Sequence, residues 1–387
     1  MINNILKITG TPIFQKYFHF FPLFITAFII SFLLVPIIGY VDRKYNFFYP
    51  GRDSLDKNDL TRSRKIHTEP KAKAGGIAVV STFLILSIFN VNISKPFLGL
   101  IFGVLVLFIG GILDDIFELN AKIQILFQFI SAFIIIGFGT GINYIKVPLY
   151  KTISLDYFQV HIFSAIRYIP SILITVIFIV FFINAIKWNA GSDGLAEGNI
   201  TIASIIIGLI SIRFLTNDTA ILSFIFAGSI LGLLAYNFYP AYIYSGSSGK
   251  SVYGFIIAVL SFISGSKMAT IIIIFSLPLI DAIWVIIYRY IKYRPKNIFK
   301  LMSISDKTHF HHKLMELGLS QKQVAYFEYT YTLVVGTFVF MLTGMHKAML
   351  LFIILSILFL ILSILSVKLK SKTNNLINVD ILRKIRE

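Results

Sequence analysis

Two groups of ionisable residues in this sequence could do chemistry. In the first, the carboxylates Asp114 and Asp115 are adjacent and directly follow an apolar segment ending Phe-Ile-Gly-Gly-Ile-Leu. Neighbouring carboxylates beside an apolar segment repel each other, and a bound cation or proton relieves that repulsion. Carboxylate oxygens suit Mg²⁺, which keeps several waters and bridges to substrate phosphates. An acidic helix-capping loop is the alternative, and the pair alone does not distinguish the two.

The second group is a histidine run in which His309, His311 and His312 fall within four residues. Imidazoles bind metals, move protons or donate hydrogen bonds to phosphate oxygens. Lysines flank the run on both sides, at Lys307 and Lys313. This positive charge favours an anion-binding site over a structural zinc site.

Two glycine-containing segments could bring backbone N–H groups close to a ligand. In the segment 189–195, Asp193 could bind a metal or a ribose hydroxyl. The segment 245–251 ends like a phosphate-binding P-loop, but its GxxGKS spacing is too short and no strand is predicted before it. We therefore interpret it only as a Gly/Ser-rich loop with affinity for phosphate.

Two further polar positions lie beside or inside apolar segments. The run His67–Gly76 places basic residues just before an apolar helix, where they could neutralise a lipid phosphate. The positive-inside rule for membrane proteins explains the same residues. Asp281 lies within an apolar segment, where an isolated charge is unfavourable. It is predicted to pair with a neighbouring basic residue or to face a cavity.

The elements that must position these residues are membrane helices. The chain has 387 residues, of which 57% are hydrophobic and 14% charged, whereas a soluble domain is about a quarter charged. Runs of roughly 20 apolar residues span a bilayer. The sequence predicts a single polytopic, all-α integral membrane domain over 1–387 with about eleven transmembrane helices. These are placed near 18–41, 75–93, 96–113, 123–145, 168–187, 198–215, 219–237, 252–265, 269–291, 326–343 and 348–367.

Lysine and arginine predict the orientation of these helices. One side of the predicted topology carries 26 of the 35 basic residues and should be cytoplasmic. The N-terminus is then outside and the C-terminus inside. The informative polar residues all fall on the cytoplasmic side, which predicts one active site there. The predicted cytoplasmic segments are 42–74, 114–122, 188–197, 238–251, 292–325 and the tail 368–387.

Net charge and cysteine content exclude other classes. The formal net charge of +17 comes from basic residues in short loops beside apolar spans, so anionic membrane lipids explain it better than nucleic acid does. The chain contains no cysteine, which excludes disulfides, thiolate nucleophiles and cysteine-based metal sites.

The ordered motifs resemble those of the polyprenyl-phosphate N-acetylhexosamine-1-phosphate transferases, of the glycosyltransferase family 4 type. His67–Gly76 resembles the family's His-x-x-Pro-x-Pro-Arg-x-Gly-Gly motif, and Gly110–Gln128 its Asp-Asp loop followed by a Lys and a Gln. Asn184–Ala196 is similar to Asn-Ala-x-Asn-x-x-Asp-Gly-x-Asp-Gly-Leu-Ala. Asp306–Ser320 resembles the family's histidine motif, and its His-x-His-His spacing resembles the subgroup that uses UDP-N-acetylglucosamine.

The resemblance implies transfer of a sugar-1-phosphate from a UDP-linked amino sugar to polyprenyl (undecaprenyl) phosphate, with release of UMP. Such enzymes lie in the bacterial cytoplasmic membrane and begin lipid-linked glycans such as O-antigen, teichoic acid and peptidoglycan. A homodimer is among the assemblies expected. Mg²⁺ or Mn²⁺ would be held by Asp114, Asp115 and Asp193. Asp114, Asp115, His309, His311 and His312 are the implied catalytic residues. Substrate binding would involve Lys73, Lys122, Asn184, Asp193, Gly194 and Ser247.

The chain departs from the family's motifs at several positions. Lys187 stands at the second Asn of one motif and Ala190 at its first Asp. Ser247 stands where the family has a metal-binding Asp, with Lys250 nearby. The alternative function is therefore a catalytically impaired relative that binds a lipid phosphate or a partner protein. A secondary transporter would need internal repeats and functional polar residues at mid-membrane. No clear repeat is visible in the sequence, and the informative polar residues lie in loops.

Overall fold

The computed structural model describes most of the chain. The described residues are 20–45, 72–146, 152–162, 165–264, 268–297, 300–301, 304, 308–342, 346–347 and 349–364. The first part of the His67–Gly76 motif, from His67 to Lys71, and the predicted tail 368–387 lie outside these residues.

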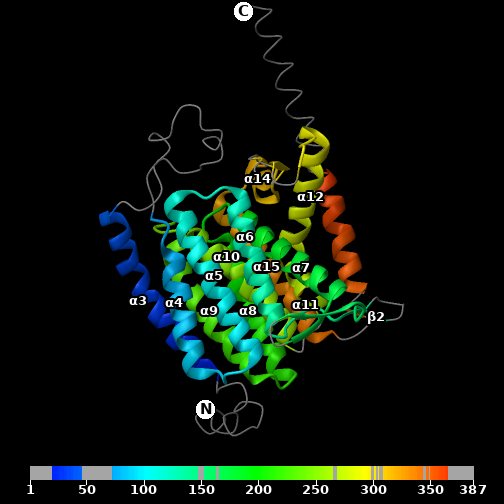
Figure 1. Cartoon of the computed structure of the whole chain (residues 1–387). Helices are drawn as coiled ribbons and strands as arrows, with labels where there is room; N and C mark the ends of the chain where they lie inside the picture. The colour runs from blue at the N-terminus through cyan, green and yellow to red at the C-terminus, as the bar shows by residue number, and fades with distance from the viewer. Residues whose placement is uncertain are drawn as a thin grey trace, which may run out of the picture.

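The described part of the chain is a bundle of helices (Figure 1). Their apolar composition fits a bilayer, in which a helix satisfies its own backbone polar groups. The helices are α3 Phe21–Tyr45, α4 Gly75–Asn90, α5 Lys95–Phe117, α6 Ala121–Gly137, α7 Ile169–Asn189, α8 Leu195–Arg213, α9 Asn217–Asn237, α10 Gly246–Ile263, α11 Met268–Ile274, α12 Ser276–Tyr293, α14 Phe310–Glu316, α15 Gln321–Met341 and a helix at Met349–Ile364.

Among the described helices, seven are long and apolar enough to cross a membrane. Three shorter apolar helices accompany them: α4, α6 and Met349–Ile364. The helical membrane class predicted from the sequence is confirmed at this level. The count of about eleven spans and the orientation stay predictions.

One predicted span, 269–291, is divided into α11 and α12. The division falls at Phe275, three residues before Pro278. Proline cannot donate to the carbonyl four residues earlier, here Ile274, and its ring would clash with that oxygen. Sequence hydropathy carries no sign of this break because both parts are apolar.

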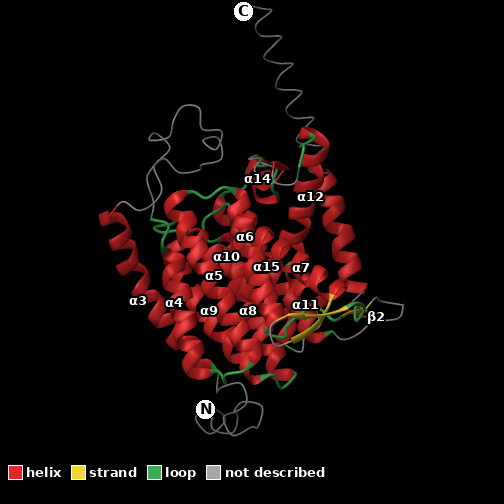
Figure 2. Cartoon of the chain, viewed as in Figure 1, coloured by secondary structure: helices red, strands yellow, loops and turns green. Residues whose placement is uncertain are grey.

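The all-α prediction omitted two antiparallel β-hairpins (Figure 2). The predicted span 123–145 stops at Gly137, and the strands follow as β1 Tyr144–Lys146, β2 Thr152–Ser154, β3 Gln159–Ile162 and β4 Ala165–Tyr168. These strands and α14 lie at opposite ends of the bundle (Figure 2). The Nε of Arg167 in β4 donates to the carbonyl of Ile136 at the end of α6, at 3.1 Å. Burial lowers the pKa of this guanidinium.

Helices also extend into segments predicted as cytoplasmic loops. Asp114 and Asp115 lie in the last turn of α5, and residues 246–251 form the first turns of α10. The segment predicted at 292–325 contains α14 and the start of α15. A predicted span ends where polar residues lower the hydropathy. A helix can continue through those residues, because its backbone hydrogen bonds do not require apolar side chains.

Helix α10 is central, since it packs on α4, α5, α7, α8, α9 and α11. Close approach to α5 requires a glycine at the crossing. A Cβ atom added at Gly111 would lie 2.5 Å from the Cα of Ser248 and 2.8 Å from the carbonyl oxygen of Ser247. The two backbones are therefore in contact close to Asp114 and Asp115, where the carboxylates of α5 lie near the start of α10.

The substitution Gly111→Ala should destabilise the protein by about 1–3 kcal/mol, because the added methyl meets backbone atoms that cannot rotate away. The control is Gly39→Ala in α3, where the nearest atom is the side-chain Cδ1 of Ile243 at 3.2 Å. Both changes gain the same helix propensity. Thermal unfolding in detergent should show a lower Tm for Gly111→Ala alone, and equal Tm values would contradict the close packing.

Candidate active site

The site begins where the start of α4 meets the start of α10. Residues 72–76 run alongside residues 242–245, with a parallel bridge between Ala72 and Ile243. The N–H groups of Gly75 and Gly76 donate to carbonyl oxygens in the partner segment, at 2.9 and 3.0 Å. The end of the His67–Gly76 motif is thereby fixed against the segment that leads into α10.

Asp115 binds the N-terminus of α10. Its Oδ1 accepts from the Ser247 N–H at 2.6 Å, and its Oδ2 from the Ser248 N–H at 2.9 Å. Gly246 has φ +65°, and a Cβ there would lie 2.4 Å from Asp115 Oδ2. Free N–H groups at the start of a helix attract negative charge, so these two hydrogen bonds offset part of the cost of burying the carboxylate.

Asp114 faces a different partner. Its Oδ1 accepts from Gln124 Nε2 in α6 at 2.9 Å. The Oε1 of the same amide accepts from the Lys187 ammonium in α7 at 2.8 Å. The half-buried Lys187 is thereby linked to Asp114 through one side chain.

Lys250 brings a second ammonium group into this region. Its Nζ donates to the Ala190 carbonyl at 3.0 Å, and the side chain is half-buried. It also interacts electrostatically with Glu197, Asp115 and Asp193. Glu197 in turn accepts a hydrogen bond from the Ser245 hydroxyl. Positive charge from α10 therefore lies among carboxylates of three different segments.

Asp193 holds the loop that precedes α10. Its Oδ2 accepts from the Ala241 N–H at 2.9 Å, and its Oδ1 from the Tyr244 hydroxyl at 3.0 Å. The adjacent Gly194 adopts φ +69° and donates its N–H to Asn237 Oδ1 at 3.0 Å. A glycine suits this left-handed backbone, which turns the chain into α8.

The histidine run is held by Asp281 of α12. His309 Nδ1 lies 2.8 Å from one oxygen of Asp281, and the Phe310 N–H donates to the other at 2.7 Å. The prediction that Asp281 pairs with a basic residue is therefore confirmed, with His309 as the partner. The three histidine side chains are buried, and their rings are in contact from His309 to His311 and from His311 to His312.

Lys313 follows the histidines in α14. Its ammonium lies 5.0 Å from the centre of the Trp284 ring, a distance at which a cation is attracted by the ring. Burial lowers the pKa of Lys313, while the charges of Asp281 and Glu316 act in the opposite direction. The histidine run therefore lies beside a further cationic side chain.

The histidine run and the carboxylate region meet at the loop after α7. A Cβ added at Gly191 would lie 2.6 Å from His311 Nε2, so the ring covers this glycine. The preceding carbonyl, of Ala190, accepts from Lys250. Adjacent loop residues thus touch the histidines on one side and the ammonium group of α10 on the other.

Most of the predicted site residues lie at this end of the bundle. Lys73 is half-buried, and its N–H donates to Asp42 at 2.8 Å. Asn184 donates to Gln128 Oε1 at 2.7 Å, which joins α7 to α6. Lys122, in contrast, is exposed in the first turn of α6. The functional roles assigned to these residues stay predictions.

Several members of the site were not selected from the sequence. Asp42 accepts the N–H groups of Lys73 and Ala74, and Gln124 joins Asp114 to Lys187. Glu197 lies in the first turn of α8, where its spacing after Asp193 could have indicated it. Asp42 gave no such signal, because it lies 31 residues from its partner.

The predicted metal ligands do not form one ligand group. Within the residues that the structure describes, no cluster of three or more His, Asp or Glu side chains is placed to hold a metal ion. Both oxygens of Asp115 and both of Asp193 already accept hydrogen bonds. The donor set therefore does not fit one divalent ion held by Asp114, Asp115 and Asp193 together.

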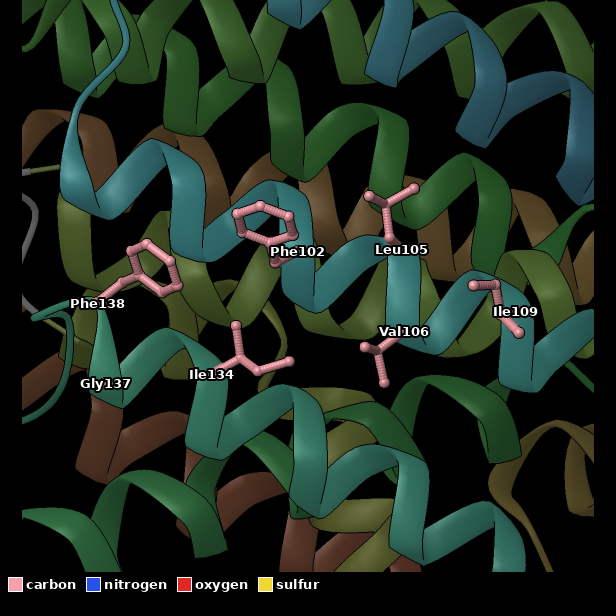
Figure 3. A pocket seen from close by; sticks show the side chains of 7 residues that line it. All are labelled: Phe102, Leu105, Val106, Ile109, Ile134, Gly137 and Phe138. Carbon is pink, nitrogen blue, oxygen red and sulfur yellow. The ribbon is translucent and has the colours of Figure 1, made fainter. Parts of the chain in front are cut away.

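An apolar cavity of about 390 Å³ lies between α5 and α6 (Figure 3). Figure 3 shows Phe102, Val106 and Ile109 on α5 opposite Ile134 on α6. None of the residues that line it is ionisable, and none is a predicted site residue. This cavity therefore offers no group that could bind a phosphate.

The fold and site define a helical membrane protein whose carboxylates, lysines and histidines converge at one end, as expected for a protein acting on phosphorylated ligands at a membrane surface. Residues 97–265 match the family described as glycosyl transferase family 4. A Bacillus subtilis (strain 168) protein described as a "probable undecaprenyl-phosphate N-acetylglucosaminyl 1-phosphate transferase" is 30% identical over 312 residues, covering 77% of this chain and 79% of the relative. The chain belongs to glycosyl transferase family 4.

Two other relatives cover comparable lengths. The decaprenyl-phosphate N-acetylglucosaminephosphotransferase of Mycobacterium leprae is 25% identical over 348 residues, which are 81% of each chain. The phospho-N-acetylmuramoyl-pentapeptide-transferase of Caldicellulosiruptor bescii is 27% identical over 324 residues, covering 80% of this chain and 94% of the relative. The similarity therefore extends well beyond the segment that matches the family.

We predict that Asp115→Asn destabilises the protein while Asp114→Asn does not. An amide at position 115 can accept only one of the two backbone hydrogen bonds and points N–H donors at the other, which costs about 1–3 kcal/mol. An amide at 114 still offers an oxygen to Gln124. Thermal unfolding of both variants in detergent tests this, and indistinguishable Tm values would refute the structural role of Asp115.

A second prediction concerns Asp281. Replacing it by alanine leaves the Phe310 N–H and His309 without their acceptor, so α14 should open more readily by about 1–3 kcal/mol. Hydrogen–deuterium exchange over residues 310–316 should accelerate roughly 5- to 150-fold. Asp218→Ala in the first turn of α9, far from this site in the fold, is the control and should leave that exchange unchanged. Unaltered exchange in Asp281→Ala would exclude Asp281 as the anchor.

Proposed function

We propose that this protein transfers N-acetylglucosamine-1-phosphate from UDP-N-acetylglucosamine to polyprenyl phosphate and releases UMP. One observation carries this proposal: the motifs shared with the family, dispersed along the sequence, converge at one end of the bundle. The names of the relatives, which describe transferases acting on undecaprenyl or decaprenyl phosphate, support the same reaction class. Their shared N-acetylglucosamine names support that sugar as the donor group.

The reaction joins two anions. An oxygen of the acceptor phosphate attacks the sugar-bearing phosphorus of the donor, and the bond from that phosphorus to the UMP oxygen breaks. A phosphate monoester has a second pKa of about 6, so the acceptor is mostly dianionic at neutral pH. Proton removal is then a small part of the barrier, whereas charge neutralisation and alignment dominate. The lysines and histidines of the site are suited to those two tasks.

We assign the two adjacent carboxylates different roles. Asp115 has both oxygens engaged by backbone N–H groups and positions the start of α10. Asp114 accepts through Oδ1 from Gln124, and we assign it the position nearest the acceptor phosphate. Asp193, Gly194 and Asn184 would shape the nucleotide side of the site.

The basic residues would contact the phosphates. His312 keeps the largest exposed fraction of the three histidines, 8% against 1% for His309 and His311. We therefore assign His312 the first contact with the donor diphosphate, with the other two rings holding it in place. The backbone of Lys73 lies beside Gly246 at the start of α10, and Lys122 would attract anions from the exposed edge. Mg²⁺ or Mn²⁺ stays a prediction from the sequence.

We propose that the protein lies in the bacterial cytoplasmic membrane with this site facing the cytoplasm. The distribution of lysine and arginine supports this orientation, since 26 of 35 lie on the predicted cytoplasmic side. UDP-sugars are soluble donors, and a site on that side would meet them. A homodimer is also predicted, and light scattering in detergent would measure it.

The alternative function, a catalytically impaired relative, is not favoured. It was motivated by Lys187, Ala190 and Ser247, which depart from the family's motifs. The named relatives are transferases. The link from Lys187 through Gln124 to Asp114 supports a role in the site for one of these departures.

The test is a transfer assay on purified protein in detergent with undecaprenyl phosphate and a panel of UDP-sugars. UMP release with UDP-N-acetylglucosamine, absent without the lipid, is the expected result. The control Lys95→Met, on an exposed residue at the opposite end of α5, should retain full activity. Folded protein that releases no UMP with any donor would move the assignment to the impaired relative.

A further inference from the structure

Two ammonium groups lie among the carboxylates where the family's motifs predict a metal. Lys187 reaches Gln124 from α7, and Lys250 reaches Ala190 from α10. Lys187 interacts electrostatically with Asp114 and Asp115, and Lys250 with Asp115. The two lysines also interact with each other across this region. Asp115 is therefore the carboxylate common to both.

The surrounding donors suit ammonium groups better than a divalent ion. Mg²⁺ requires near-octahedral oxygen ligands at 2.0–2.1 Å, usually with one or two carboxylates. Here Asp115 and Asp193 have both oxygens occupied by N–H or O–H donors, and Ser247 offers a hydroxyl where the family has a carboxylate. Two nearby ammonium groups would also repel a dication. Each carboxylate instead has a lysine within electrostatic range.

Both lysines remain able to bind a ligand. Each makes one hydrogen bond within the described part of the chain, and an ammonium carries three donors. Both side chains are half-buried, so each is partly accessible. A lysine binds phosphate as a point charge, and partial burial strengthens that attraction because water screens it less.

We propose that Lys187 and Lys250 neutralise the diphosphate of the UDP-sugar in place of a divalent metal ion, so that this protein binds its donor without metal. The departures from the family's motifs at 187 and 247, together with the lysine at 250, then form one compensated change. An Asp is lost at 247, and positive charge is gained at 187 and 250. The inference rests on the proposed function for the identity of the donor.

A purely structural role for the lysines is the competing explanation. In that case they only balance the charge of Asp114 and Asp115, and the ligand still requires metal. Charge balance predicts that removing a lysine lowers stability, and it predicts no change in ligand affinity for variants that fold. Affinity measured without metal separates the two explanations.

The experiment measures binding of UDP-N-acetylglucosamine to the full-length protein in detergent by calorimetry, in EDTA and in Mg²⁺. We expect dissociation constants that agree within about threefold between the two conditions. Lys187→Met and Lys250→Met should each weaken binding about tenfold or more, as for the loss of a hydrogen bond to a charged group. Lys95→Met removes an exposed lysine elsewhere and should change nothing. Binding that needs Mg²⁺, or folded lysine variants that bind like wild type, overturns the proposal.

A double variant tests the same proposal if the single lysine variants do not fold. Ser247→Asp combined with Lys250→Ser restores the family's carboxylate at 247 and removes the ammonium group at 250. Its binding of UDP-N-acetylglucosamine should become sensitive to EDTA, and tight binding in EDTA would refute the role of Lys250. This variant keeps a polar residue at each position, so the start of α10 retains its hydrogen bonding.

UMP release measured on the same samples separates this inference from the proposed function. Transfer that occurs only with Mg²⁺ overturns the inference and leaves the function standing. Lysine-dependent donor binding in EDTA without any UMP release overturns the function and leaves the lysine site standing. Absence of donor binding under every condition overturns both.

Discussion

Buried carboxylates at the end of an apolar helix bundle must be given hydrogen-bond donors, and the rest of the site depends on how this is done. A charge left unsatisfied in such surroundings costs several kcal/mol. Four aspartates solve the problem in the same way, by accepting backbone N–H groups from a distant segment. Asp42 binds the approach to α4, Asp115 the start of α10, Asp193 the loop before α10 and Asp281 the start of α14.

In this arrangement, carboxylates that could take part in the chemistry of the site also hold its segments together. The same carboxylates that the sequence marks as catalytic candidates hold the loops against one another, and glycines at 111 and 246 let the backbones come close enough. Asp115 and Asp193 each have both oxygens engaged in hydrogen bonds. This supports the proposal that Lys187 and Lys250, rather than a metal ion, supply the positive charge beside them. A site built this way is preorganised, since its dipoles and charges are fixed before a ligand arrives.

Much of the fold could be predicted from hydropathy, because each predicted span overlaps a helix in the described part of the chain. What hydropathy missed has local physical causes. Pro278 divides one apolar segment into α11 and α12, and the residues after Gly137 form hairpins. The site was predicted through its residue types: Asp114, Asp115 and the histidines could be selected by their spacing. The sequence marked Lys187 only as a departure from a motif and Lys250 only as a nearby charge, because the role of a lysine depends on which carboxylates it approaches.

The sequence by itself determined the membrane class, the order of the motifs and the side chains capable of phosphate chemistry, since composition and short spacings are local properties. Only the tertiary structure decided which groups are partners. Asp115 and Ser248 are 133 residues apart, and Asp281 and Phe310 are 29 apart. No periodicity along the chain encodes such pairs. They follow from the packing of whole helices, which brings the ends of α5 and α7 to the start of α10 and the first half of α12 to the start of α14, and so sets where each charge is neutralised.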